Sequence, residues 1–299
     1  FIYSRPLEYI YDYIEKKFGK KHPEMIAPNR KVVFDGFNYA SNIQAVADTY
    51  RVAPARLEAG TYRNITGNQA AAWGLIAAAE KSGLPLFCGS YPITPATSIL
   101  EELAIHKYLN VKTMQTEDEI AGICCAIGAA FAGNLAVTTT SGPGLSLKSE
   151  ALGLAVMTEL PLVVIDVQRA GPCTGMPTKT EQADLNEALY GRNGESPMVV
   201  IASHSPAHCF DTAFMAARIA LERMVPVLML SEGFLGNGSE PWRIPSMSDY
   251  PEIHPNYVPS GCEAYKPFER DAGTLSRKWA VPGMPGFEHR VGGLEKNHN

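Results

Sequence analysis

Short apolar runs alternate with longer amphipathic segments between about residues 66 and 239. Runs rich in Val, Leu and Ile predict strands, and hydrophobic residues spaced three and four apart predict helices. The predicted strands cover 84–88, 111–114, 135–140, 161–167, 198–202 and 226–231. The predicted helices cover 68–82, 98–109, 118–132, 145–158, 181–190 and 206–223. Ser98 and Glu101 have the spacing of a capping box at the start of the second helix.

The predicted strands are apolar almost without interruption, as in Pro161-Leu162-Val163-Val164-Ile165. Such strands are typical of a parallel sheet that helices cover on both faces. The regular alternation of strands and helices therefore predicts an α/β fold with a doubly wound parallel sheet.

Segments of different character flank this region. Residues 1–62 open with a helical pattern from Leu7 to Phe18 and lose periodicity beyond Pro28, as a linker would. Residues 241–299 are rich in proline and have little periodicity. We expect a core domain at 63–240 and, at 241–299, an extended connector toward a further domain.

Composition narrows the class of protein. The formal net charge is −5, and no concentrated basic face is visible, which argues against a general nucleic-acid binder. No run approaches the length of a membrane-spanning helix. None of the six cysteines forms a C-x-x-C pair, so neither a zinc ribbon nor a complete iron–sulfur ligand set is expected. We expect buried, reduced thiols and a cytoplasmic protein without a metal of its own.

Ligands of open parallel sheets bind at the carboxyl ends of the strands, so the loops that follow the strands are candidate binding loops. After 84–88, two prolines frame Thr94, which is either a turn residue or a hydroxyl ligand. At the end of 135–140, the loop Thr138-Thr139-Thr140-Ser141-Gly142-Pro143-Gly144 is either a hydroxyl-rich anion cradle or a tight turn. After 161–167, Arg169 either binds a substrate carboxylate or pairs with an acid such as Asp166 or Glu181, and Arg290 is the next candidate for the carboxylate.

Three acids, Glu117, Asp118 and Glu119, precede a helix of small residues. Acids at a helix start can simply complement its dipole. However, the small residues at 121–130 predict a helix buried against other backbones, at an interface with another chain. A carboxylate at the mouth of such a helix would be partly desolvated, which raises its pKa toward values useful in proton transfer.

Five strings carry a resemblance to a known family. They are Gly67-Asn68-Gln69-Ala70, Tyr91-Pro92-Ile93-Thr94-Pro95, Gln115-Thr116-Glu117, Thr140-Ser141-Gly142-Pro143-Gly144 and Gln168-Arg169-Ala170-Gly171-Pro172. In this order they resemble the alpha subunit of the 2-oxoacid:ferredoxin oxidoreductases, over nearly the whole chain. Residues 1–62 are similar to the end of the family's gamma domain with its linker, and residues 191–196 are similar to the 2-oxoglutarate type.

The resemblance implies a pyrimidine-binding domain for thiamine diphosphate at 63–240. It implies oxidative decarboxylation of a 2-oxoacid with coenzyme A, giving acyl-CoA, CO2 and reduced ferredoxin. A partner beta subunit would share the thiamine diphosphate and hold Mg2+ and a [4Fe-4S] cluster. The resemblance implies that Glu117 contacts the pyrimidine N1′, that Tyr91, Pro92, Ile93 and Thr94 also line the cofactor, and that Arg169 with Thr94 binds the substrate carboxylate.

Two other interpretations stay open at this point. A thiamine-dependent decarboxylase or carboligase without electron transfer would share the same fold and glutamate. A scaffold domain that has lost its chemistry would also keep the fold, because fold does not fix function.

Overall fold

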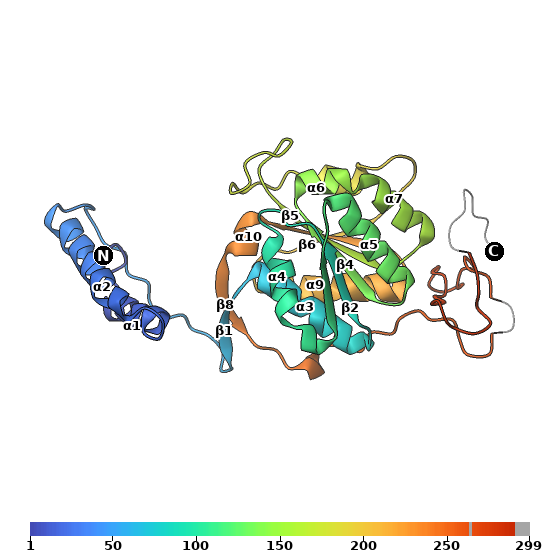
Figure 1. The fold of residues 1–299 in the computed structure, drawn as a ribbon, viewed down its shortest axis with the longest axis horizontal. Coiled ribbons are helices and arrows are strands. Elements are labelled where there is room, and N and C mark those ends of the chain that lie inside the picture. The colour runs from blue at the N-terminus through green and yellow to red at the C-terminus, as the bar shows by residue number, and fades with distance from the viewer. Residues whose placement is uncertain (263–264, 291–299) are drawn as a thin grey trace. The chain divides into compact units, whose positions relative to one another are not determined.

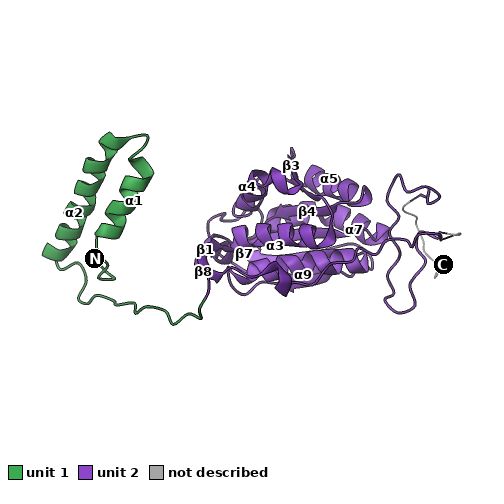
Figure 2. Cartoon of the chain, turned by 90° about the horizontal axis from the view of Figure 1, so that it is seen from below, with its two compact units in different colours: residues 1–59 green, residues 60–299 purple. Residues whose placement is uncertain are grey.

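The computed structural model describes residues 1–262 and 265–290, and the chain divides into two compact units, residues 1–59 and 60–299 (Figure 2). The first unit holds α1 (Glu8–Phe18), a short 3-10 turn η1 (Pro23–Met25) and α2 (Ile26–Asn42). The prediction of a linker beyond Pro28 is wrong where α2 forms. Pro28 stands in the first turn of that helix, where its missing N–H costs no hydrogen bond. An i,i+4 contact of 2.6 Å between Lys31 and Asp35 supports the helix further along.

The second unit is built on a parallel sheet, as the alternating pattern predicts. Within the described residues the sheet has six strands in the order β3-β2-β4-β5-β7-β6, and every neighbouring pair is parallel. The strands are β2 (Leu86–Ser90), β3 (Val111–Gln115), β4 (Leu135–Thr140), β5 (Leu162–Gln168), β6 (Val199–Ala202) and β7 (Pro226–Glu232). β4, β5 and β7 are buried along their full length, which confirms the double coverage expected from their continuous apolar character.

Helices cover both faces of this sheet (Figure 1). One core cluster packs α3 (Gly67–Ser82), α4 (Thr97–Ile105) and α9 (His208–Arg223) against residues such as Val163 and Ile165 of β5. The other packs α5 (Glu119–Phe131), α6 (Gly142–Leu147) and α7 (Ser149–Thr158) against Leu162 and Val164. The doubly wound α/β fold is thereby confirmed. Shorter elements complete the unit: η2 (Lys107–Leu109), α8 (Leu185–Tyr190), α10 (Gly233–Asn237) and η3 (Met247–Asp249).

Several local predictions need correction. The Ser98–Glu101 capping box does not form, because Ser98 lies inside α4 and accepts a hydrogen bond from Asn68 instead. A capping box is present at Thr66 and Gln69, at the start of α3. The helix predicted at 145–158 is split at Lys148 into α6 and α7, and the helix predicted at 181–190 begins only at Leu185.

An antiparallel strand pair was not predicted. β1 (Tyr62–Thr66) pairs with β8 (Ser239–Arg243), with Tyr62 opposite Arg243 and Thr66 opposite Ser239. This ladder joins the two ends of the expected core domain and extends across both of its expected limits. The assignment of residues 1–62 to a gamma-like domain and of 241–299 to a connector remains a prediction.

The cysteines are less buried than expected. Cys88 and Cys209 are buried, whereas Cys124 and Cys173 are exposed, because α5 and the loop after β5 turn these two side chains to the surface. No described helix combines the length and the apolar character that crossing a membrane requires.

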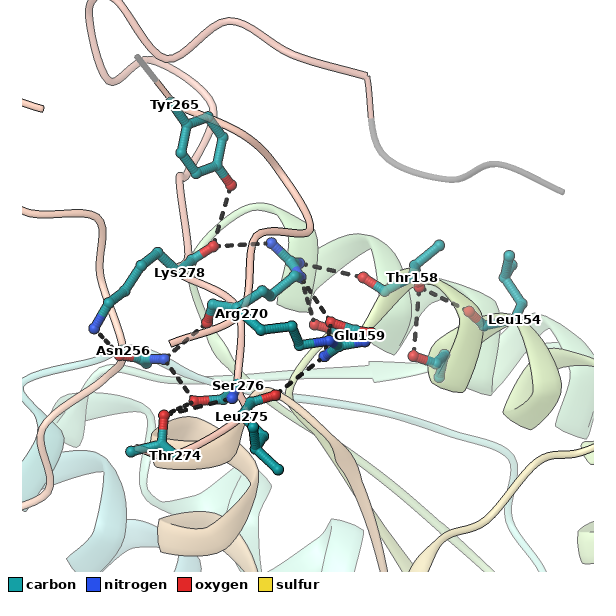
Figure 3. A network of polar contacts seen from close by, with 12 residues as sticks. Leu154, Thr158, Glu159, Asn256, Tyr265, Arg270, Thr274, Leu275, Ser276 and Lys278 are labelled. Atoms are coloured by element: carbon teal, nitrogen blue, oxygen red, sulfur yellow. Dashed lines mark hydrogen bonds and ion pairs between the residues drawn. The ribbon is translucent and has the colours of Figure 1, made fainter. Parts of the chain in front are cut away.

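The proline-rich segment is fastened to the end of α7. The side chain of Arg277 is buried and donates to the main-chain oxygens of Thr158 and Glu159 at 3.2 and 3.1 Å. These carbonyls lie at the helix end, where intrahelical partners run out. The Glu159 carboxylate also accepts hydrogen bonds from Arg270, and Tyr265 donates to the Lys278 oxygen (Figure 3). The described part of the expected connector is therefore packed against the domain.

Replacing Arg277 with Met should destabilise the second unit by about 2–4 kcal/mol, because it removes two hydrogen bonds from a buried guanidinium to the carbonyls at the end of α7. Arg270→Met is the matched control. The Arg270 side chain is 39% exposed, and the Glu159 carboxylate that it contacts keeps Arg277 at 4.0 Å, so a smaller loss of about 1 kcal/mol is expected. Urea unfolding of both variants checks the difference, and equal losses would contradict the importance of Arg277.

Candidate active site

Loops from neighbouring strands meet at the carboxyl edge of the sheet. The order in which strands are added to the sheet reverses beside β2: β3 lies on one side of it, and β4 lies on the other. At the end of β2, the Ser90 hydroxyl donates to the main-chain oxygen of Thr139 at 2.7 Å. The main-chain oxygen of Ser90 accepts a hydrogen bond from the Thr116 N–H at 3.0 Å. The candidate loops after β2, β3 and β4 are thus held together at a topological switch point.

The three acids after β3 have different environments. Asp118 is the N-cap of α5, and its carboxylate accepts from the Ala121 N–H at 2.7 Å. Glu117 precedes the helix and is exposed, whereas the Glu119 side chain turns inward and is only 8% exposed. The desolvation that the sequence argument requires of a proton-transfer carboxylate is therefore met at Glu119. The assignment to Glu117 stays a prediction without this support.

Glu119 lies in a tight enclosure. A Cβ atom at Gly144, in α6, would come within 2.7 Å of Glu119 Cγ and 2.1 Å of Thr140 Oγ1. The fully buried Lys148 donates from Nζ to the main-chain oxygen of Glu119 at 2.8 Å. Burial lowers the pKa of Lys148 to about 8, although the negative charges of Glu119 and Asp118 oppose this shift. The loop predicted as an anion cradle or a tight turn thus packs against the buried glutamate.

Arg169 and Thr94 are brought together, as the candidate substrate site requires. Arg169 is buried, and its two terminal nitrogens donate to the main-chain oxygens of Thr94 and Thr174 at 2.7 and 2.8 Å. Its Nε–H is buried and has no partner among the described residues. The alternative pairing with Glu181 is not supported, because Glu181 accepts instead from the Gly171 N–H. A guanidinium has five N–H groups, so Arg169 keeps donors for an anionic ligand.

A cleft of about 690 Å3 opens beside Arg169. It is lined by the start of α6, the loop after β5 and α8, and its lining residues include Ser146, Cys173, Asp184 and Glu187. The predicted cofactor residues Tyr91, Pro92 and Ile93 are not among the described lining residues of this cleft. The Ile93 oxygen accepts from the N–H groups of Ala96 and Thr97, which anchors the turn before α4.

The sequence argument did not identify Glu119 as the inward acid, and it did not single out the buried Lys148 or the half-buried Asp184. It named the buried Asp166 only as a possible partner of Arg169. A signal for Glu119 was present, because it lies four and eight residues before Ile123 and Ile127, both on the buried face of α5. Asp166 likewise shares a strand face with Leu162 and Val164. Neither Lys148 nor Asp184 has a local signal of this kind.

Gly144→Ala should destabilise the protein by about 1–3 kcal/mol, because the added methyl group would collide with Thr140 and displace Glu119. Gly153→Ala, in α7, is the matched control. Nothing lies within 4 Å of a Cβ there, so its stability should be unchanged or raised by up to about 1 kcal/mol. Thermal unfolding measures both effects, and a Gly144→Ala variant as stable as the Gly153→Ala variant would show that the enclosure is loose.

The chain is similar to known proteins over most of its length. The family profile of pyruvate flavodoxin/ferredoxin oxidoreductase, thiamine diphosphate-binding, matches residues 78–299. The 2-oxoglutarate oxidoreductase subunit KorA of Mycobacterium tuberculosis is 56% identical over 294 residues, which cover 98% of this chain and 45% of that protein. The 2-oxoglutarate synthase subunit KorA of Methanothermobacter marburgensis is 42% identical over 60% of this chain and 47% of that protein.

A solved structure is also similar. It is the 2-oxoglutarate:ferredoxin oxidoreductase of Magnetococcus marinus with 2-oxoglutarate, coenzyme A and succinyl-CoA bound, at a TM-score of 0.84 and 35% identity, covering 99% of this chain and 50% of that one. The chain thus spans about half the length of the relatives that it matches. The family expected from the five strings is confirmed: the chain belongs to the pyruvate flavodoxin/ferredoxin oxidoreductase family and carries its thiamine diphosphate-binding domain.

Proposed function

We propose that this chain is the alpha-type part of a 2-oxoacid:ferredoxin oxidoreductase that acts on 2-oxoglutarate. The overall reaction converts the 2-oxoacid and coenzyme A into acyl-CoA and CO2, and transfers an electron pair to ferredoxin. The observation that carries the proposal is a buried carboxylate, Glu119, at the carboxyl edge of a parallel sheet that also presents Arg169 to a cleft. The names and the bound 2-oxoglutarate of the relatives support the choice of substrate.

The residues at this edge fit the pyrimidine end of thiamine diphosphate. Glu119 is desolvated, and Gly144 leaves the space beside its side chain that a Cβ would fill. In this proposal a buried glutamate accepts a hydrogen bond at the pyrimidine N1′ and controls the proton on that ring. When bound, thiamine diphosphate supplies the stabilised carbanion that decarboxylation needs. The fit favours Glu119 over the sequence-based choice of Glu117, and both remain candidates.

Arg169 has a separate role in the proposal. Arg169 lines the cleft, and its remaining terminal N–H groups would hold the C1 carboxylate of the 2-oxoacid, while the Thr94 and Thr174 oxygens keep the guanidinium in place. A planar guanidinium suits a carboxylate because it can offer two parallel donors. Tyr91, Pro92, Ile93 and Thr94 remain proposed neighbours of the cofactor.

The proposal divides the work between subunits. A beta subunit would hold the diphosphate, Mg2+ and a [4Fe-4S] cluster, and the assembled enzyme would act in the cytoplasm. Purification with that partner, followed by an assay of ferredoxin reduction with several 2-oxoacids, tests the function. Reduction that needs both 2-oxoglutarate and coenzyme A supports it. Release of CO2 without reduction would indicate a non-redox decarboxylase, and the absence of both a scaffold.

Glu119→Gln keeps the shape of the side chain but removes its charge. We expect kcat to fall by about 100-fold or more, the usual loss when a general acid–base group is removed. Glu117→Gln removes a charge two residues away and should leave kcat close to that of the unmodified enzyme. Steady-state assays of both variants decide between the two glutamates, because a large loss in Glu117→Gln alone would reverse the assignment.

Arg169→Lys should lower kcat/KM for 2-oxoglutarate by roughly 10- to 100-fold, since charge-assisted hydrogen bonds contribute about 1.5–3 kcal/mol and an ammonium cannot make the planar two-point contact. Arg218→Lys is the matched control, because Arg218 pairs with Glu222 on α9. If Arg169→Lys lowers the unfolding temperature while kcat/KM stays normal, the arginine is structural only.

A further inference from the structure

Two carboxyl groups meet in the wall of the cleft, outside the contacts assigned above. Asp166 lies on β5 and is fully buried, and Asp184 lies just before α8 and lines the cleft. Their side chains are within hydrogen-bonding reach of each other. From the other side, a Cβ at Gly142 would lie 2.7 Å from Asp184 Oδ2, so the start of α6 presses Asp184 toward the sheet.

The part of the chain that the structure describes supplies no donor to the facing oxygens of these two carboxyl groups. Both carboxyl oxygens of Asp166 and the Oδ2 atom of Asp184 are buried without a hydrogen-bond partner among the described residues. Two ionised carboxylates at this distance would repel each other, and a buried charge without a partner is strongly unfavourable. A hydrogen bond between two carboxyl groups becomes possible when one of them carries a proton.

Other ways to neutralise the pair are less well supported. Lys148, whose ammonium group acts on Asp166, donates to the main-chain oxygen of Glu119. Arg169 donates to the oxygens of Thr94 and Thr174. Across the described residues, no group of three or more His, Cys, Asp or Glu side chains could hold a metal ion. A proton is therefore the cation that best fits the pair.

We propose that Asp166 and Asp184 share one proton, and that this protonated pair fastens the cleft wall at residues 169–187 to the end of β5. The segment leaves the sheet at Arg169. A second contact holds Asp184 near the end of β5, because the Asp184 N–H donates to Gln168 Oε1 at 3.0 Å. Loss of the proton would place two negative charges in contact and loosen the wall from the strand. Any effect on substrate binding rests on the proposed function, whereas the proton site does not.

The charges around the pair act in the expected direction. Burial, followed by the negative charge of Asp184, raises the pKa of Asp166 well above its ordinary value, while Lys148 opposes the shift. Burial also raises the pKa of Asp184, although its hydrogen bond with Asp166 lowers it. The other charged groups that face the pair are Glu187 and Glu181 from the cleft wall.

The sign of the pH effect follows from this shift. The folded protein binds the shared proton more tightly than the unfolded chain, whose carboxyl groups titrate near pH 4. The contribution of the proton to stability is therefore complete at low pH and is lost as the pH rises from about 4 toward the raised pKa of the folded state.

Asp166→Asn tests the proposal, because its amide group donates to Asp184 at every pH. Between about pH 4 and the raised pKa of the folded state, the difference between the unfolding temperature of this variant and that of the unmodified protein should grow by about 3–5 °C for each pH unit. Asp184→Asn should behave in the same way. Glu187→Gln is the matched control, because it removes a neighbouring charge but leaves the shared proton. Its unfolding temperature should change with pH as steeply as that of the unmodified protein. Thermal unfolding of the intact protein between pH 5 and pH 9 gives these values.

The opposite result is equally clear. If ionised Asp166 paired with Lys148, Asp166→Asn would be less stable than the unmodified protein at neutral pH and would not gain on it as the pH rises, which would overturn the proposal. Infrared spectroscopy gives a second readout that needs no variant to fold. In the unmodified protein, a protonated carboxyl band should persist at pH values above the ordinary titration range of carboxyl groups near pH 4 and titrate away at higher pH, and its absence above that range would also refute the shared proton. Neither readout requires turnover, so failure of the proposed activity would leave both interpretable.

Discussion

The carboxyl edge of the sheet depends on one buried contact, the hydrogen bond from the Lys148 ammonium to the main-chain oxygen of Glu119. An ammonium is costly to bury unless acceptors replace its water. The contact therefore ties the first turn of α5, which follows β3, to the junction of α6 and α7, which follows β4. That tie brings Glu119 against Gly144, and it coincides with the break in the helix that the sequence predicts as continuous.

The same contact explains why the acids near Lys148 are stabilised in different ways. Lys148 is surrounded by Glu119, Asp118 and Asp166, so a single cation faces several acids at the edge of the sheet. Each acid is accommodated differently: Asp118 by the N–H groups of a helix start, Glu119 by enclosure next to the ammonium, and Asp166 by contact with a second carboxyl group. Arg169 stands apart from them and donates to backbone oxygens, so no carboxylate of the described residues is shown to neutralise its positive charge. An anionic ligand would find this charge available.

Much of this arrangement could be predicted from sequence because it depends on local patterns. Continuous apolar runs predicted the buried strands, and the loops after β2, β4 and β5 were identified because parallel strands end at one edge. The ladder between β1 and β8 could not be predicted in this way, since it joins residues 62–66 to residues 239–243 without a local signal. The contact of Asp166 with Asp184 depends on the path of an irregular loop. The choice between Glu117 and Glu119 stays open from the sequence for a different reason, because it needs the phase of α5 rather than its existence.

That phase also gives α5 two different faces, which bears on assembly. Glu119, Ile123 and Ala126 are buried, whereas Ile120, Cys124 and Gly128, four residues apart, are exposed. A Cβ at Gly128 would meet nothing within 4 Å, so another backbone could approach this face closely. In the proposed enzyme this is the surface that suits the partner subunit. Because it begins at Ile120, next to Glu119, a partner that covers it would also remove water from the mouth of the glutamate site. Proton control at the pyrimidine would then depend on the second subunit, which excludes water, as well as on this chain.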